Sequence, residues 1–182
     1  MNIKLKLLEF YVPFIIRYKI LSEIYKITGE AFKDKLIISN SINHRKGLKR
    51  YAIYSNELTL GAIYSRKDLE EIKYRLYRNS YIVGHKLRKF FSITNIEEAM
   101  QTAEIFYDII GIEFSANDKN EITINKCYFS DYYDCRVCNI ISAIDEGIIA
   151  GLTNGAKINF INRITDGNKC CYAKLDIKDV QG

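Results

Sequence analysis

The chain has 182 residues, 48% of them hydrophobic and 27% charged, with a formal net charge of +5 at pH 7. This balance is typical of a soluble globular protein, and the length predicts a single domain over residues 1–182. No stretch approaches the roughly 20 apolar residues that cross a bilayer, so no membrane association is expected. The short basic runs are expected to be solvated faces, and no nucleic-acid partner is predicted.

The N-terminal apolar run is interrupted by Glu9 and Pro13, and no small-residue cleavage site follows it. A secretory signal peptide has an unbroken apolar core and such a site. We therefore expect a cytoplasmic protein. In that reducing compartment the five cysteines are expected to be free, metal-ligating or catalytic rather than joined in disulfides.

Apolar residues recur at spacings of three or four from Leu7 to Tyr25, which is the pattern of an amphipathic helix. Pro13 suits the start of a helix or a kink within one. Gly29 is expected to separate this helix from a second helix over residues 31–38. The first forty residues are therefore predicted to be helical.

The polar and basic segment 39–55 is predicted to be a loop, and the helical pattern returns from Leu58 to Tyr77. Thr94 and Glu97 have the spacing of a capping box, in which two side chains satisfy free backbone amides at a helix start. The box predicts a helix over residues 96–110, ended by Gly111.

After Gly111 the hydrophobic period becomes alternating, which is typical of strands, except over one helical segment. The predicted elements are a hairpin of strands 112–116 and 122–129, a helix over 134–150 ended by Gly151, and strands over 157–164 and 170–175. The predicted fold class is α+β. Helices within residues 1–110 pack on a four-stranded antiparallel sheet, and residues 111–182 form a β-β-α-β-β half.

All five cysteines lie between Cys127 and Cys171. If residues 134–150 are a helix, four chemically active side chains share one stripe of it, at about 100° per residue. These side chains belong to Cys135, Cys138, Ser142 and Asp145. Thiols, a hydroxyl and a carboxylate on one face predict a reactive or metal-binding site.

Within that stripe Cys138 is the candidate nucleophile, and Asp145 is the candidate group that orients a substrate or a water. A thiol reacts as the thiolate, so a base, a cation or a helix N-terminus must lower its pKa. Cys135 lies in the first helical turn, where the helix dipole helps. The alternative is that these cysteines pack as small hydrophobic residues, since free cysteine is often buried.

A zinc site is a second interpretation of the same residues. Cys135 and Cys138 would supply half of it, and Cys127 with either Cys170 or Cys171 would complete four ligands. Adjacent Cys170 and Cys171 point to opposite faces of a strand, so only one of them can join. Apart from this possible zinc, no metal or cofactor is predicted.

Arg163, near the end of its strand, can hold a substrate carboxylate through paired hydrogen bonds, or it can be an exposed edge arginine. His44 and His85 stand in basic surroundings outside the cysteine block, and neither is chosen as a general base. Serine hydrolase, Walker and dinucleotide-binding fingerprints are absent from the sequence.

The segment from Gly84 to Leu175 resembles the L-2-amino-thiazoline-4-carboxylic acid hydrolase-like family of small bacterial proteins. The ending is also similar to that of vinyl-reductase-type ligand-binding domains, in which cysteines can hold zinc. The resemblance rests on Cys127-Tyr-Phe, Cys138, Asp145 and the ending from Phe160 to Cys171, where Arg163 and Thr165 precede Gly167 and a cysteine.

The resemblance implies that water opens a small sulfur-containing heterocycle at a non-peptide carbon–nitrogen bond. Cys138 would be the nucleophile or ligand, Asp145 the acid or base, and Arg163 the carboxylate anchor. Cys127 and Cys171 would line the same pocket. Ser142, from the helix stripe, joins this substrate-binding set, whereas Cys135 and Cys170 are secondary.

The leading hypothesis is a cytoplasmic hydrolase of a thiazoline- or amidine-like acid that uses Cys138 and Asp145. The alternative is a non-catalytic module that binds or senses a small molecule, with zinc on Cys127, Cys138 and Cys171. A third interpretation is a purely structural, partner-binding protein. In the first two cases the expected partner is a small molecule, and a homodimer stays open.

Overall fold

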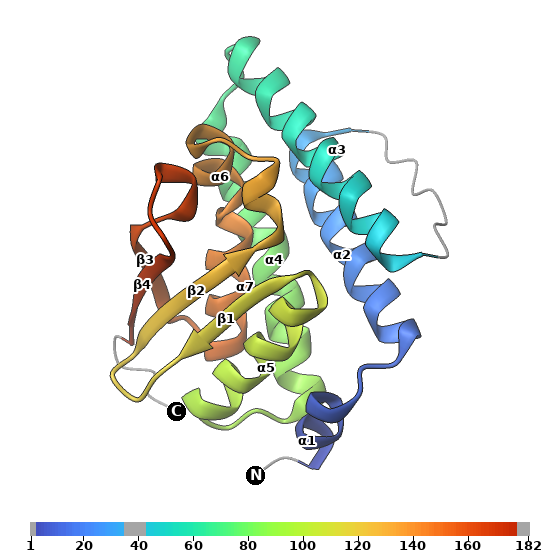
Figure 1. The fold of residues 1–182 in the computed structure, drawn as a ribbon, viewed down its shortest axis with the longest axis vertical. Helices are drawn as coiled ribbons and strands as arrows, with labels where there is room; N and C mark the ends of the chain where they lie inside the picture. Colours follow the sequence, from blue (N-terminus) through green and yellow to red (C-terminus); the bar gives the residue numbers. More distant parts are fainter. Residues whose placement is uncertain (1–2, 35–42, 178–182) are drawn as a thin grey trace.

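The computed structural model describes residues 3–34 and 43–177. Helices come first along the chain, and a small sheet with two further helices follows (Figure 1). The helices are α1 (Ile3–Phe10), α2 (Phe14–Phe32), α3 (His44–Tyr64), α4 (Leu69–Phe91), α5 (Ile96–Ile109), α6 (Cys135–Ile141) and α7 (Ala143–Thr153). The strands are β1 (Ile112–Ala116), β2 (Glu121–Cys127), β3 (Lys157–Asn162) and β4 (Cys171–Asp176), with 3₁₀ turns η1 (Tyr128–Asp131) and η2 (Ile164–Asp166).

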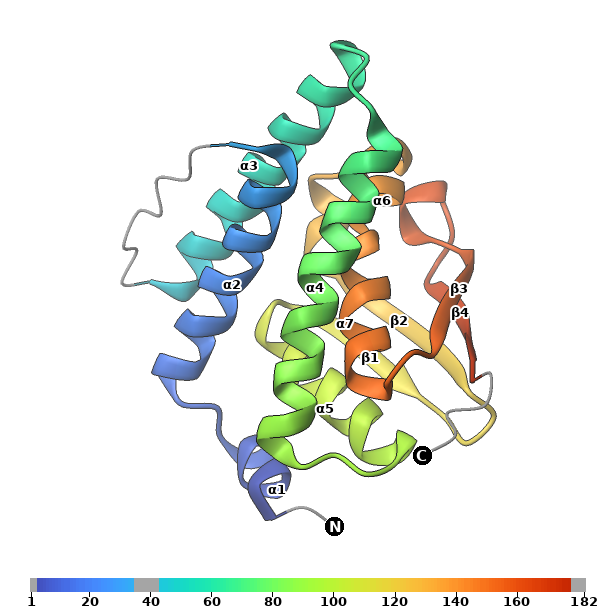
Figure 2. The ribbon, with the colours of Figure 1, turned by 180° about the vertical axis from the view of Figure 1, so that it is seen from behind.

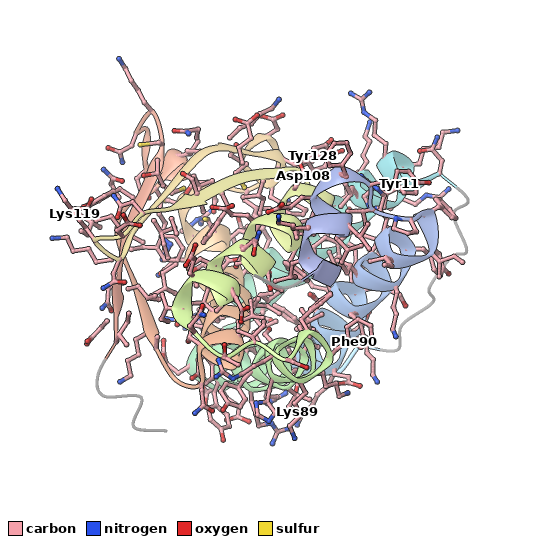
Figure 3. The ribbon with its side chains drawn as sticks, turned by 90° about the horizontal axis from the view of Figure 1, so that it is seen from below. Tyr11, Lys89, Phe90, Asp108, Lys119 and Tyr128 are labelled. Carbon is pink, nitrogen blue, oxygen red and sulfur yellow. The ribbon has the colours of Figure 1, made fainter. Side chains whose placement is uncertain are left out.

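The strands form one antiparallel sheet in the order β1-β2-β4-β3, which confirms the predicted α+β class. Along β4, Cys171, Ala173 and Leu175 are buried and alternate with more exposed residues, so one face of the sheet packs on the helices. The hairpin of β1 and β2 is long. Seen from below, Lys119 at its tip and Tyr128 just after β2 lie at its opposite ends (Figure 3).

Helix α7 is the central element of the layered arrangement. It lies between the sheet on one side and α4 on the other, as the reverse view shows (Figure 2). Two glycines of α7 face α4: a Cβ on Gly147 would lie 2.9 Å from the backbone nitrogen of Tyr81, and one on Gly151 would lie 2.9 Å from the Cα of Gly84. The two helix backbones are therefore nearly in contact, which only residues without a side chain permit.

The predicted loop over residues 39–55 is wrong where the structure describes it, since α3 begins at His44. Asn43 caps this helix: its side-chain oxygen accepts a hydrogen bond from the backbone nitrogen of Lys46 at 3.1 Å. Leu48, Tyr51 and Ala52 are buried along one face of α3. The basic residues between them occupy the other faces and hide the helical period in the sequence.

Helix α2 also differs from its prediction, because it runs through Gly29 without a break. Pro13 does stand at its start, as a helix-initiating proline should. The helix ends at Lys33, which has a left-handed φ of 56°. Most of the second helix that was predicted over residues 31–38 falls outside the described residues.

Two helix boundaries near α4 and α5 are shifted. The single helix predicted from Leu58 to Tyr77 is wrong, because α3 ends at Tyr64 and a new helix, α4, follows. Asp68 caps α4: its side chain accepts a hydrogen bond from the backbone nitrogen of Glu71 at 3.0 Å. The capping box before α5 lies one residue later than predicted. The Asn95 side chain accepts a hydrogen bond from the backbone nitrogen of Glu98, and a Glu98 carboxylate oxygen accepts one from the backbone nitrogen of Thr94 at 3.0 Å.

The predicted cysteine helix over residues 134–150 is two helices that meet at Ser142, which is the C-cap of the first and the N-cap of the second. The prediction that Gly151 ends the helix is also wrong. Gly151 lies inside α7, where it permits the close approach to α4, and the chain leaves the helix at Asn154 with a left-handed φ of 63°. The strand predicted over residues 157–164 ends earlier, at Asn162, where η2 follows.

Among the described residues, no helix combines the length and the apolar character that crossing a bilayer requires.

Candidate functional site

A small cavity lies where α6 and α7 meet the ends of the hairpin strands and the α2–α3 pair. Its volume is about 60 Å³. Since one water needs about 10–15 Å³ on this measure, the cavity has room for about five waters. The residues that line it are Ile24, Tyr51, Ile110, Ile112, Cys127, Phe129, Tyr133, Cys138, Ile141, Ser142, Ile144 and Asp145.

Four of the predicted site residues line this cavity: Cys127, Cys138, Ser142 and Asp145. Two helices and one strand end supply them, because α6 carries Cys138, α7 carries Asp145, and Cys127 ends β2. The break at Ser142 places this hydroxyl at the junction of the two helices, between the other two side chains in sequence. The predicted thiol and carboxyl therefore do share one cavity.

Arg163 and Cys171 stand beside this cavity although they do not line it. Burial raises the pKa values of Cys138, Cys171 and Asp145, and the positive charge of Arg163 partly opposes this rise at all three groups. The Cys171 sulfur accepts a hydrogen bond from the backbone nitrogen of Ile164 at 3.4 Å. The two residues therefore join the same group as the cavity-lining side chains.

The remaining candidates lie elsewhere. Cys135 is exposed, Cys170 is half-buried, and neither lines the cavity. His44 begins α3 and His85 lies within α4, stacked on Tyr81 with ring centroids 6.0 Å apart. Neither histidine lines the cavity, so its acid–base chemistry falls to other groups.

Among the groups that line the cavity, Asp145 has a pKa that the fold shifts into the neutral range. Its removal from water by surrounding protein atoms raises the pKa of its carboxyl to about 7. The Tyr107 hydroxyl and the Arg163 charge partly oppose this rise. A carboxyl with a pKa near 7 is about half ionised at neutral pH, so it can both accept and donate a proton.

The thiols around the cavity are protonated in the resting state. Burial raises the pKa of Cys127 to about 12, and it also raises the pKa values of Cys138 and Cys171. Arg163 and Thr165 act in the opposite direction on Cys138, since a cation and a hydrogen-bond donor both favour the thiolate. Cys138 is thus the cavity-lining thiol with activating neighbours of both kinds.

The Arg163 guanidinium is available for an anion. Its Cζ lies 4.1 Å from the centroid of the Phe160 ring, a cation–π contact that holds the side chain in place. Among the salt bridges of the described residues, none involves Arg163. A stacked guanidinium without an ion pair can bind a carboxylate through two parallel hydrogen bonds.

Two hydroxyl groups, those of Tyr107 and Thr165, lie at the site but were not among the predicted site residues. The Tyr107 hydroxyl is buried next to the Asp145 carboxyl, and Thr165 lies next to Cys138. Neither hydroxyl makes a hydrogen bond of normal geometry within the described residues. Tyr107 is buried on α5, and only the three-dimensional fold shows that it reaches Asp145 of α7.

Replacing Tyr107 by phenylalanine is expected to raise the pKa of Asp145 above its value of about 7. The hydroxyl favours the ionised carboxyl, so its removal favours the protonated form. Carboxyl carbon chemical shifts followed through a pH titration by NMR measure this directly. Tyr172→Phe is the control, because Tyr172 bonds Glu121 away from the site. An unchanged Asp145 pKa in Tyr107→Phe would contradict the contact.

The donor set does not form a metal centre. Within the described ranges, no three His, Cys, Asp or Glu side chains come close enough together to hold a metal ion. The zinc interpretation of Cys127, Cys138 and Cys171 therefore has no support from their positions. The arrangement can instead offer one thiol, one titrating carboxyl and one cation to a small organic molecule.

Comparison with known proteins adds nothing to this geometry. No protein-family model matches the chain, and no curated protein matches it either.

Proposed function

We propose that this protein is a hydrolase that opens a small sulfur-containing heterocycle, of the thiazoline or amidine carboxylate type, at a non-peptide carbon–nitrogen bond. One observation carries the proposal. A thiol, a carboxyl with a pKa near 7 and an unpaired cation gather at one cavity, although Cys138, Asp145 and Arg163 come from different elements.

The size of the cavity supports a small cyclic substrate. Room for about five waters corresponds to about 150 Å³ of liquid. Drug-sized ligands occupy pockets of about 300–1,000 Å³. A single five-membered ring with one or two short substituents is the size class that remains. Most of the cavity wall is apolar, which suits a ring that contains sulfur.

Asp145 is suited to activate Cys138. An ordinary carboxylate has a pKa several units below that of a thiol and is a poor base for it. Because burial raises the pKa of Asp145 to about 7, this pKa lies closer to that of a thiol, and proton transfer from the thiol to the carboxylate is less unfavourable. In the proposed reaction the Asp145 carboxylate takes the thiol proton through a water. The sulfur bonds to the amidine carbon, and the π electrons of the exocyclic C=N bond of the imino tautomer move to that nitrogen.

The exocyclic C=N bond then re-forms as the ring carbon–nitrogen bond breaks, and the protonated Asp145 gives its proton to the ring N–H, which leaves as the amine. Water attacks the same carbon, loses its proton to Asp145, and releases the Cys138 sulfur, which takes the proton back. Arg163 binds the substrate carboxylate outside the apolar part of the cavity and fixes the direction of the ring. Cys127, Ser142 and Cys171 shape the wall around it.

Replacing Cys138 by serine tests this proposal. We expect the turnover of a thiazoline carboxylate to fall by about 100-fold or more, because the serine hydroxyl is a far weaker nucleophile in this setting. Product formation is followed by NMR or mass spectrometry. Cys135→Ser is the matched control, since Cys135 is exposed on the same helix and should not affect turnover. Equal turnover in Cys138→Ser and the parent protein would rule out the nucleophile.

One observation favours a second function, which is the binding of a small molecule without catalysis. Burial keeps the thiols of Cys127, Cys138 and Cys171 protonated, and a protonated thiol is an apolar wall rather than a nucleophile. The same assay separates the two functions. Saturable binding of a thiazoline carboxylate with no product over long incubation identifies a binding module.

A further inference from the structure

The turn η2 between β3 and β4 brings hydrogen-bond donors to the sulfur atoms of the site. The backbone nitrogen of Ile164, the first residue of η2, donates a hydrogen bond to the Cys171 sulfur at 3.4 Å. The next residue, Thr165, lies against Cys138 on α6. Two neighbouring residues of one short turn thus face two different thiols.

The Thr165 hydroxyl has no other partner. Its Oγ1 atom is buried, and no group among the described residues forms a hydrogen bond of normal geometry with it. Buried hydroxyls in proteins are nearly always hydrogen-bonded, so an unpaired one beside a titratable group indicates a functional contact. The thiol of Cys138 is a weak acceptor, whereas its thiolate is a strong one.

The position of this hydroxyl is fixed by the turn. The backbone nitrogen of Asp166 bonds the Arg163 carbonyl at 3.1 Å, and that of Gly167 bonds the Ile164 carbonyl at 2.9 Å. Asn168 adds a side-chain bond to the Arg163 carbonyl at 3.0 Å. Gly167 has a φ of 89°, a conformation that favours glycine and closes the turn. Thr165 is therefore held in place before any ligand arrives.

We infer that Thr165 is a positioning residue whose hydroxyl donates a hydrogen bond to the Cys138 sulfur when that sulfur carries negative charge, and so directs the thiolate toward the cavity. This inference rests on the proposed role of Cys138 as nucleophile. It adds a second activating group to Arg163, one that acts at the sulfur itself. No atom is transferred in this step, since Thr165 keeps its proton throughout.

The other charged and titratable groups near Cys138 must be held constant in a test. The groups that act on Cys138 are Asp145 on α7, Arg163 before η2, Cys171 on β4, Cys127 at the end of β2 and Tyr133 before α6. Substitution at Thr165 leaves all of them unchanged.

The test measures how fast iodoacetamide alkylates Cys138 as a function of pH. Only the thiolate reacts, so the rate follows the ionised fraction. Cleavage by trypsin after Arg136 separates Cys138 from Cys135, and mass spectrometry then quantifies each site. We expect Thr165→Val to slow alkylation about fivefold to tenfold at neutral pH, and to move the midpoint of the profile up by almost one unit.

Two variants make the outcome decisive. Thr165→Ser keeps the hydroxyl and should retain the profile of the parent protein, and Thr123→Val, on β2 outside the site, should leave it unchanged. Equal profiles in Thr165→Val and the parent, including no reaction in either, overturn the inference. An equal loss in the valine and serine variants overturns it too, because the methyl group would then be what matters. A shifted profile in a protein without turnover would keep this inference and reject the hydrolase.

Discussion

Replacing Asp145 by asparagine is expected to make the folded protein more stable above pH 7 while it removes the proposed activity. Asparagine has nearly the same shape as aspartate but cannot ionise. The folded protein holds this carboxyl in surroundings that raise its pKa to about 7. In the unfolded chain the same carboxyl has a pKa of about 3.9.

The pH range of the effect follows from these two values. Below about pH 4 the carboxyl is protonated in both states and its burial costs nothing extra. Between about pH 4 and pH 7 the unfolded chain releases the proton while the folded protein keeps it, so stability falls as pH rises. Above pH 7 the penalty is constant. Three pKa units at about 1.4 kcal/mol each set an upper limit of about 4 kcal/mol.

Because the Asp145 side chain keeps some contact with solvent, we expect Asp145→Asn to gain about 2–4 kcal/mol at pH 8. The gain should vanish near pH 4. Turnover should fall by about 10²- to 10⁴-fold, the usual contribution of a general acid or base. Urea unfolding at several pH values, beside the turnover assay, measures both effects.

Asp108→Asn, on the exposed face of α5, is the matched control and should alter neither quantity. A difference in stability between Asp145→Asn and the parent protein that stays the same from pH 4 to pH 8 would contradict the raised pKa. A gain in stability together with full turnover would support the raised pKa of Asp145 but contradict its role as an acid or base in the reaction.

Replacing Gly147 by alanine is expected to lower the free energy of unfolding by about 2 kcal/mol. A Cβ at this position would meet the carbonyl oxygen of Tyr77 and lie 2.9 Å from the backbone nitrogen of Tyr81. Backbone atoms cannot rotate away, so the cost is at the upper end of the about 1–3 kcal/mol of overpacking. The better helix propensity of alanine offsets about 1 kcal/mol of it.

Gly61→Ala separates packing from propensity. Gly61 is exposed in α3, and a Cβ there has nothing within 4 Å. This variant should therefore gain up to about 1 kcal/mol from helix propensity alone. Denaturant unfolding of both variants gives the comparison. A stability gain in Gly147→Ala equal to that in Gly61→Ala would mean that α7 and α4 are not in close contact.

The sequence predicted the sheet and the site better than the helices. Alternating apolar residues in β1, β2, β3 and β4 identify strands because one sheet face is buried. The spacing of Cys138, Ser142 and Asp145 predicts one helix stripe, and in the structure all three line one cavity. This agreement survives the break at Ser142, since the residue keeps a helical φ of −61°.

The errors have local physical causes. In α3 the basic residues conceal a buried face of small and aromatic side chains, so composition was a poor guide. Gly151 has the residue type of a helix end, but here its missing side chain serves a helix–helix contact. Tyr107 reaches the site through folding of distant segments, which no local pattern in the chain records. Thr165 belongs to the motif that follows Arg163, but its place beside Cys138 depends on the fold.

The backbone contact of α7 with α4 also sets when the site forms during folding. Residues 92–142 separate the two helices along the chain and contain α5, the β1–β2 hairpin and α6. Contacts between such distant segments close late, after local helices and hairpins. Until α7 docks, the Asp145 carboxyl remains in water with an ordinary pKa. The raised pKa of this carboxyl is therefore acquired only when α7 packs against its neighbours, and it marks a chain whose helices have reached their final places.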